Sequence, residues 1–245
     1  MLSTRTKSIL ASLVVSVVFL ITTPCFSKDA APTEADAQAP VYLVSDLMKK
    51  YNINFTGNVT LDYVTSYLWR GQALDRDSVV QPGVNLNLGP LSAGYWGNWD
   101  VNNNDSLNSG ESDYYVALTH AITDYVTVGI GHTWYGFPGS HTNSREVFAS
   151  ITLPKLPLTP IIGYAHDYDE GKMNLLTGER TGASNYYSLT LSQSIPLLPK
   201  YGTSLELGSI FGYVDNQWLE RRGWHITPSA GLKIALANNI TIQPT

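Results

Sequence analysis

From Phe55 to the end of the chain, apolar and polar residues alternate with a period of two, and this alternation constrains the fold more than any other feature. In residues 124–135, one face carries Val126, Val128, Ile130 and Trp134, and the other carries Thr127, Gly129, Gly131 and Thr133. Successive side chains of a β-strand point to opposite faces of the sheet. The pattern therefore predicts strands with one apolar face and one weakly polar face, and no helical periodicity follows Tyr51.

Eleven segments show this alternation. They are residues 54–70, 78–88, 91–100, 112–121, 124–136, 145–153, 160–168, 184–194, 203–214, 223–234 and 239–244. A tilted strand needs about 9–11 residues to cross a bilayer, whereas strands of soluble sandwiches typically have five or six. Most of these segments are long enough to span a membrane, so their lengths favour a membrane-spanning sheet over a soluble β-sandwich.

The connectors alternate between tighter and longer ones, although 195–202 is slightly longer than 71–77. The tighter ones are 89–90, 122–123, 154–159, 195–202 and 237–238. The others, polar and mostly longer, are 71–77, 101–111, 136–144, 169–183 and 214–223. An up-and-down barrel with turns at one rim and loops at the other produces such alternation. Aromatic residues near strand ends, such as Trp69, Trp99 and Trp134, predict girdles at two membrane interfaces.

The predicted fold class is therefore all-β, a transmembrane up-and-down antiparallel β-barrel of about 12 strands. Eleven strands are visible, single-chain bacterial barrels have even numbers, and the chain ends without the usual terminal aromatic residue. We therefore expect that a closing strand is missing at the C-terminus. The alternative is that one strand has been split or merged in the count.

The N-terminus predicts export to the outer membrane of a Gram-negative bacterium. Arg5 and Lys7 precede an apolar run at residues 9–21, which fits the core of a signal peptide and is too short for a spanning helix. Small residues favour cleavage after Ser27. The predicted organisation is a signal peptide at 1–27, a flexible leader at 28–53 that could hold a short helix, and the barrel at 54–245. A retained membrane anchor is the alternative.

Charge and composition exclude some partners. Charged residues make up 14% of the chain, below the roughly 25% of soluble domains. Removing residues 1–27 takes away two of the 15 Lys and Arg and none of the 20 Asp and Glu, which leaves a net charge of −7. No basic cluster is present, so nucleic acid is not an expected partner. The expected partners are outer-membrane lipid and small solutes, and the sequence does not define an oligomeric state.

Three sequence patches carry a family resemblance. They are Ser-Tyr-Leu-Trp-Arg-Gly at 66–71, Val-Gln-Pro-Gly at 80–83 and Ala-Gly-Tyr-Trp-Gly-Asn-Trp-Asp at 93–100. Together they resemble the TorF-type porin family of proteobacterial outer-membrane proteins, over residues 60–100. The resemblance implies an outer-membrane barrel, suggests a pore and names no solute. The chain departs from the family pattern at Asp100-Val101, where other members more often have small residues.

The predicted inward face carries seven candidate pore-lining residues. They are Asp62, Arg70, Asp113, Asp167, Glu206, His225 and Lys233. A barrel turns its apolar side to lipid, so these residues are expected to line the lumen, where they could set selectivity. Alternatively they form salt bridges that plug the barrel, with Glu206–Lys233 as a cross-strand pair. Arg70 is expected at or just inside the outer rim, where it could attract anions or bind loop carbonyls.

The function predicted from these patterns is a porin-like passive channel for small solutes, with no enzyme activity and no cofactor. One alternative is a lipid-modifying enzyme that uses His225 in a Ser–His–acid set. Ser229 lies about 13 Å along the same strand, too far for a direct hydrogen bond. Another alternative is a closed structural or surface-binding barrel with functional loops.

The sequence predicts no metal site. The five histidines have no metal-binding spacing. Asp100, Asn102, Asn104 and Glu111 match positions 1, 3, 5 and 12 of a calcium-binding loop. However, Asp105 replaces the required glycine and strands flank the loop, so we interpret the match as chance.

Overall fold

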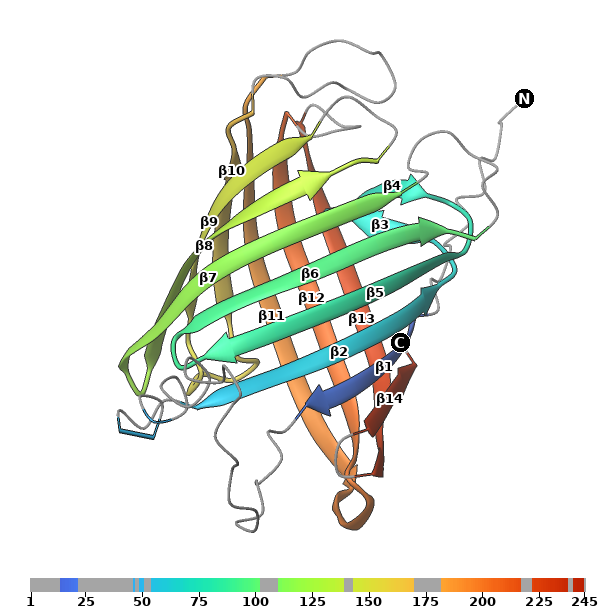
Figure 1. Ribbon diagram of the computed structural model, residues 1–245, viewed down its shortest axis with the longest axis vertical. Helices are drawn as coiled ribbons and strands as arrows, with labels where there is room; N and C mark the ends of the chain where they lie inside the picture. Colours follow the sequence, from blue (N-terminus) through green and yellow to red (C-terminus); the bar gives the residue numbers. More distant parts are fainter. Residues whose placement is uncertain are drawn as a thin grey trace, which may run out of the picture.

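The computed structural model describes residues 14–21, 46, 49–50, 54–101, 110–138, 143–169, 182–216, 222–237 and 240–244. From Phe55 onward, eleven strands form one large antiparallel sheet that curls round on itself (Figure 1). They are β2 (Phe55–Val64), β5 (Val79–Leu88), β6 (Leu91–Asp100), β7 (Glu111–Thr123), β8 (Val126–Gly136), β9 (Ser144–Thr152), β10 (Ile161–Asp167), β11 (Ser184–Leu198), β12 (Thr203–Asp215), β13 (Arg222–Ala237) and β14 (Ile240–Pro244). The predicted number of strands from Phe55 onward in this sheet and their antiparallel order are confirmed.

The connections divide the sheet into a turn end and a loop end. At the turn end, β5 and β6 are joined by residues 89–90, β7 and β8 by 124–125, and β9 and β10 by 153–160. The strand β11 continues to Leu198, so its link to β12 is shorter than predicted and holds the 3-10 helix η1 (Pro199–Tyr201). The turn predicted at 237–238 lies partly outside the described residues. The predicted alternation of short and long connectors is confirmed in part, because the turn-end link 153–160 is slightly longer than the link 137–143 between β8 and β9.

The two faces of the sheet differ as the alternation predicts. Large apolar side chains are exposed on the outer face, for example Ile130 (58%), Ile162 (50%) and Ile226 (66%). Their neighbours on the inner face are small or polar, for example Gly129 and Gly163. The side chains therefore alternate between an apolar outer surface and a polar inner surface along each strand.

The first predicted strand, 54–70, is wrong in its second half. The chain bends at residues 65–66, and β3 (Tyr67–Trp69) pairs with β4 (Gln72–Asp75) in a separate two-stranded sheet. Arg70 (φ 50°) and Gly71 (φ 76°) form the turn, and two consecutive residues with positive φ are typical of a tight hairpin. We call residues 65–78 the inner hairpin.

A further strand, β1 (Val14–Ile21), pairs with β2 on one side and with β14 on the other, so that it joins the two ends of the sheet (Figure 1). These residues are the apolar run predicted as the signal-peptide core, and its valines also favour a strand. Thus β1 stands in the twelfth position, where a C-terminal strand was expected.

At the other end of the sheet, β14 is only five residues long, and β13 pairs with it only within 234–237. Most of the predicted signal peptide and leader lies outside the described residues. Among the residues that the structure describes, no helix is long and apolar enough to cross a membrane.

Candidate functional site

The base of the inner hairpin is fixed to the sheet by a hydrophobic cluster. Val64 at the end of β2, Tyr67, Leu74 and Val79 at the start of β5 are buried together. Trp96 of β6 packs against them, with its ring centroid 5.4 Å from that of Tyr67. Burying a side chain of this size contributes about 1.5–3 kcal/mol. The cluster therefore holds the hairpin at the loop end.

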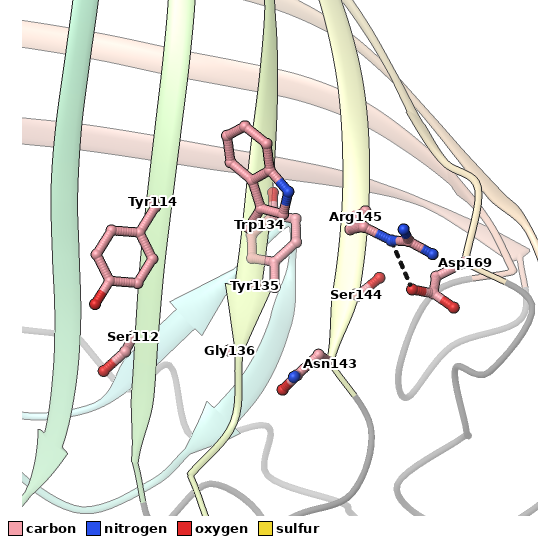
Figure 2. Close-up of a pocket in the computed structure, with 9 residues that line it drawn as sticks. All are labelled: Ser112, Tyr114, Trp134, Tyr135, Gly136, Asn143, Ser144, Arg145 and Asp169. Atoms are coloured by element: carbon pink, nitrogen blue, oxygen red, sulfur yellow. Dashed lines mark hydrogen bonds and ion pairs between the residues drawn. The ribbon is translucent and has the colours of Figure 1, made fainter.

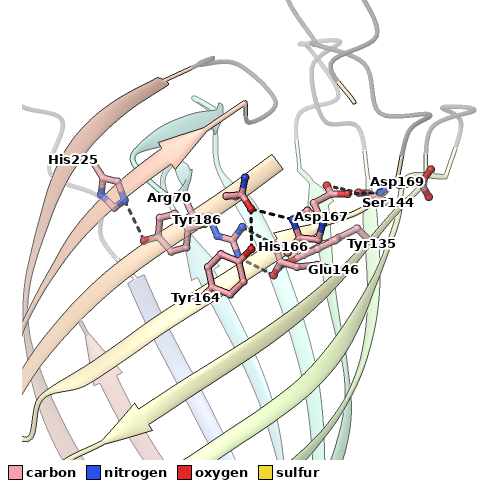
Figure 3. A network of polar contacts seen from close by, with 11 residues as sticks. Arg70, Tyr135, Ser144, Glu146, Tyr164, His166, Asp167, Asp169, Tyr186 and His225 are labelled. Atoms are coloured by element: carbon pink, nitrogen blue, oxygen red, sulfur yellow. Dashed lines mark hydrogen bonds and ion pairs between the residues drawn. The ribbon is translucent and has the colours of Figure 1, made fainter. Parts of the chain in front are cut away.

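The tip of the inner hairpin reaches the inner face of strands on the far side of the sheet. Arg70 donates two hydrogen bonds to the Glu146 carboxylate of β9, Nη1 to Oε2 at 2.7 Å and Nη2 to Oε1 at 2.8 Å (Figure 3). The Tyr135 hydroxyl of β8 donates to Glu146 Oε1 at 3.1 Å. Both partners are shielded, since the side chains of Arg70 and Glu146 are 13% and 3% exposed. Two-pronged, charge-assisted pairing of this kind is strong and directional.

Two aromatic rings enclose the same guanidinium group. The Arg70 Cζ atom lies 4.4 Å from the ring centroid of Trp69 and 4.3 Å from that of Tyr186 on β11. Burial alone would lower the pKa of Arg70, but Tyr135 and Glu146 raise it above its ordinary value, so the group stays charged. We call Trp69, Tyr135, Glu146 and Tyr186 the Arg70 cage.

Next to the cage, the backbone of Gly71 lies directly against His225 of β13. A Cβ atom added to Gly71 would lie 2.5 Å from the His225 Cβ, so only glycine fits. His225 Nε2 is 3.1 Å from the Tyr186 hydroxyl, and Nδ1 is 3.0 Å from Thr227 Oγ1. Its two ring nitrogens thus contact a tyrosine and a threonine, and the structure does not pair His225 with Ser229.

Four of the seven candidate pore-lining residues lie toward the loop end, and one of them, Arg70, belongs to the inner hairpin itself. Besides Arg70 and His225, Asp113 of β7 accepts a hydrogen bond from the Gly136 amide at 3.4 Å. Asp167 of β10 accepts one from the Ser144 hydroxyl and one from the amide of Asp169. Their carboxylates are buried. The structure therefore gathers most of the predicted set at the loop end.

Asp62 lies on β2 near the same end, where it is half-buried. Glu206 and Lys233 lie toward the turn end and do not form the predicted ion pair among the described residues. The register places Lys233 opposite Ser204, so the two charges sit on a diagonal, where residues are about 7–8 Å apart. Glu206 instead accepts hydrogen bonds from Ser194 and Ser204. The prediction failed because the register was unknown.

The Arg70 cage contains residues that the sequence analysis missed. Arg70 is predicted at or just inside the outer rim, where it attracts anions or binds loop carbonyls; its partner in the structure is instead the Glu146 carboxylate of β9. Glu146 follows the inward alternation of β9 with Phe148 and Ser150, so its orientation could have been predicted. Its contact with Arg70 could not, because the two residues are 76 positions apart.

Only two of the four residues that match the calcium-binding loop lie among the described residues. Asp100 ends β6 and Glu111 begins β7, while Asn102 and Asn104 lie outside the described residues. Among the described side chains, no group of three or more His, Cys, Asp or Glu could hold a metal ion.

A pocket of about 420 Å³ opens at the loop-end rim, over β7, β8 and β9 (Figure 2). Its lining includes Tyr114, Trp134 and Arg145 from the outer face. Arg145 pairs with Asp169 at 3.2 Å and lies 5.3 Å from the Tyr168 ring centroid. Tyr135 lines this pocket and also belongs to the Arg70 cage, whereas Arg70 and Glu146 do not line the pocket.

One comparison with known proteins found a match. The model of a family described as "Bacterial protein of unknown function (Gcw_chp)" matches residues 49–215. This stretch contains the strands from β2 to β12, the inner hairpin and the whole Arg70 cage, and it ends before His225. No curated protein and no solved structure matches the chain.

Proposed function

The chain belongs to the Gcw_chp family of bacterial proteins of unknown function, and we propose that it is an outer-membrane β-barrel that forms a narrow, porin-like channel for small solutes. The observation that carries this proposal is the contrast between the two faces of the sheet. The outer face exposes large apolar side chains on strand after strand, and the inner face carries polar groups and the inner hairpin. Hydrocarbon outside and water inside would suit these faces.

Aromatic residues support two membrane interfaces. At the loop end, outward side chains are joined by hydrogen bonds, for example Tyr164 to Asn185 at 2.9 Å and His132 to Tyr168 at 2.6 Å. At the turn end, Tyr125 and Tyr201 are 64% and 62% exposed. Rings with a polar group favour the headgroup region, so these residues would form the two girdles.

Closure of the wall is part of the proposal. An open sheet edge in hydrocarbon would leave backbone N–H and C=O groups unpaired, and each such group costs several kcal/mol. In the structure, the edges of the eleven-stranded sheet, β2 and β14, both pair with β1, whose residues belong to the predicted signal peptide. Once that peptide is removed, another strand in the place of β1 would complete an even-numbered barrel.

The inner hairpin would narrow this channel at the loop end. Toward the turn end, the inner face is lined by small polar side chains such as Ser150, Ser188 and Thr190. Toward the loop end, it carries the hairpin and large side chains such as Tyr135 and Tyr186. The hairpin therefore would set the narrowest passage and limit the channel to small solutes.

The test is conductance of the purified protein, refolded in detergent and inserted into planar bilayers. We expect discrete, small current steps, and larger steps when residues 67–75 are replaced by a short glycine linker. A matched control replaces the nine residues 101–109, between β6 and β7, by the same linker. A refolded protein that shifts its electrophoretic mobility on boiling but never conducts, with or without the hairpin, would refute the channel. Release of acyl chains from added lipid would favour an enzyme instead.

A further inference from the structure

The loop end contains a site that already binds a guanidinium group. We propose that the Arg70 cage is a binding site for solutes that carry a guanidinium group, and that Arg70 is the resident occupant that such a solute displaces. This inference rests on the proposed channel function, since the solute must enter the lumen.

The wall half of the cage does not depend on the hairpin. Tyr135, Glu146 and Tyr186 belong to β8, β9 and β11, and their positions are fixed by strand pairing. The Tyr135 hydroxyl donates to Glu146 Oε1, and both carboxylate oxygens accept a hydrogen bond from the Arg70 guanidinium group. A planar guanidinium group matches a carboxylate with two parallel hydrogen bonds, which a point-like ammonium group cannot do. The geometry therefore favours guanidinium over other cations.

The side chains around the Arg70 cage favour a bound cation. Glu146 is 3% exposed, and a buried carboxylate without a partner is strongly unfavourable. Asp113 and Glu111 on β7 are also buried at this end, and both face inward. Without Arg70, the cage would leave the buried Glu146 carboxylate without its cationic partner, so a cationic solute would be attracted and an anionic solute repelled.

Arg70 is held in a way that permits exchange. It sits in a two-residue turn at a φ of 50°, in the left-handed region that is unfavourable for residues other than glycine. The hydrophobic cluster anchors the base of the hairpin, whereas the tip depends on the cage and on the contact of Gly71 with His225. Because Arg70 competes from within the chain, at an effective concentration in the millimolar range, a solute should bind the wild-type protein weakly. Removing its side chain should strengthen binding.

The test measures binding of ethylguanidinium, a small analogue of the Arg70 side chain, by the thermal unfolding of refolded protein in detergent. In Arg70→Ala, we expect a saturable rise of about 3–6 °C when the ligand exceeds its Kd tenfold. The apparent Kd should be at least tenfold higher in the wild type. The rise should vanish in Arg70→Ala/Glu146→Gln, and butylammonium, which lacks the planar fork, should act more weakly on Arg70→Ala.

A folded Arg70→Ala protein without a saturable rise would overturn the proposal, as would equal rises in all three proteins. The mobility shift on boiling shows whether a variant has refolded. If Arg70→Ala does not refold, Arg70→Gln serves as the second variant. The readout needs no conductance, so the two proposals fail separately. Binding without current refutes the channel but supports the guanidinium site. Current without binding supports the channel but refutes the guanidinium site.

Discussion

The ion pair between Arg70 and Glu146 should couple the inner hairpin to the wall, and a double-mutant cycle measures that coupling. The perturbations are Arg70→Met, Glu146→Gln and both together. Breaking a buried ion pair by removing one partner costs about 3–5 kcal/mol. The hairpin tip can move away and Arg70 keeps 13% exposure, so we expect the lower end of this range, about 3 kcal/mol, for each single variant.

The double variant should lose less than the sum of the two, by about 2 kcal/mol, because neither charge is then left alone. Arg70→Met also removes two ring contacts, each contributing about 0.5–2 kcal/mol, whereas Glu146→Gln keeps them. Arg70→Met should therefore be at least as destabilising as Glu146→Gln.

The assay is urea-induced unfolding in lipid vesicles, followed by tryptophan fluorescence and by electrophoretic mobility. Arg222 and Asp215 provide the control pair, because they are joined at 2.9 Å near the same end but Arg222 is 75% exposed. Their substitutions should be close to additive, since exposed pairs couple weakly. Additivity within about 0.5 kcal/mol at Arg70 and Glu146 as well would refute the reasoning.

Three other predictions test the hairpin turn, the wall and the N-terminus. Gly71→Ala should lower the unfolding midpoint more than Gly182→Ala, because both glycines have positive φ but a Cβ meets neighbouring atoms only at Gly71; equal losses would leave backbone strain as the sole cause. Leu189→Arg should reduce insertion into bilayers, by about 2–4 kcal/mol at the midplane, whereas the adjacent inward Thr190→Arg should insert normally; similar insertion of both would contradict the assigned faces. Mass spectrometry of protein extracted from outer membranes should show Lys28 as the first residue, and a retained 14–21 segment would instead assign β1 to the wall.

The strands were predictable because their signal is local. Alternation within about ten residues reports which side chains share a face, and the same alternation placed Asp113, Asp167 and His225 on the inner side. The inner hairpin escaped prediction because alternation continues through the bend at residues 65–66, so the first strand was extended to Arg70. The positive φ of Arg70 leaves no such pattern in a sequence.

Contacts between strands that are distant in the sequence could not be predicted from alternation within one strand. Whether Glu206 lies opposite Lys233 depends on the register between β12 and β13. In the observed register Lys233 lies opposite Ser204, two residues away from Glu206. The contact between Arg70 and Glu146 depends on how far the sheet curls and on which way one connector folds. Neither quantity is encoded in the spacing of apolar residues.

The position of the inner hairpin also sets an order of events during folding. The hairpin is synthesised early, but its tip contacts β9, β11 and β13, which follow much later in the chain. Closing such long loops is slow because the entropy is lost before the contacts form. The Arg70–Gly71 peptide bond should therefore remain open to trypsin until the last strands have assembled, so resistance to cleavage there would time the completion of folding.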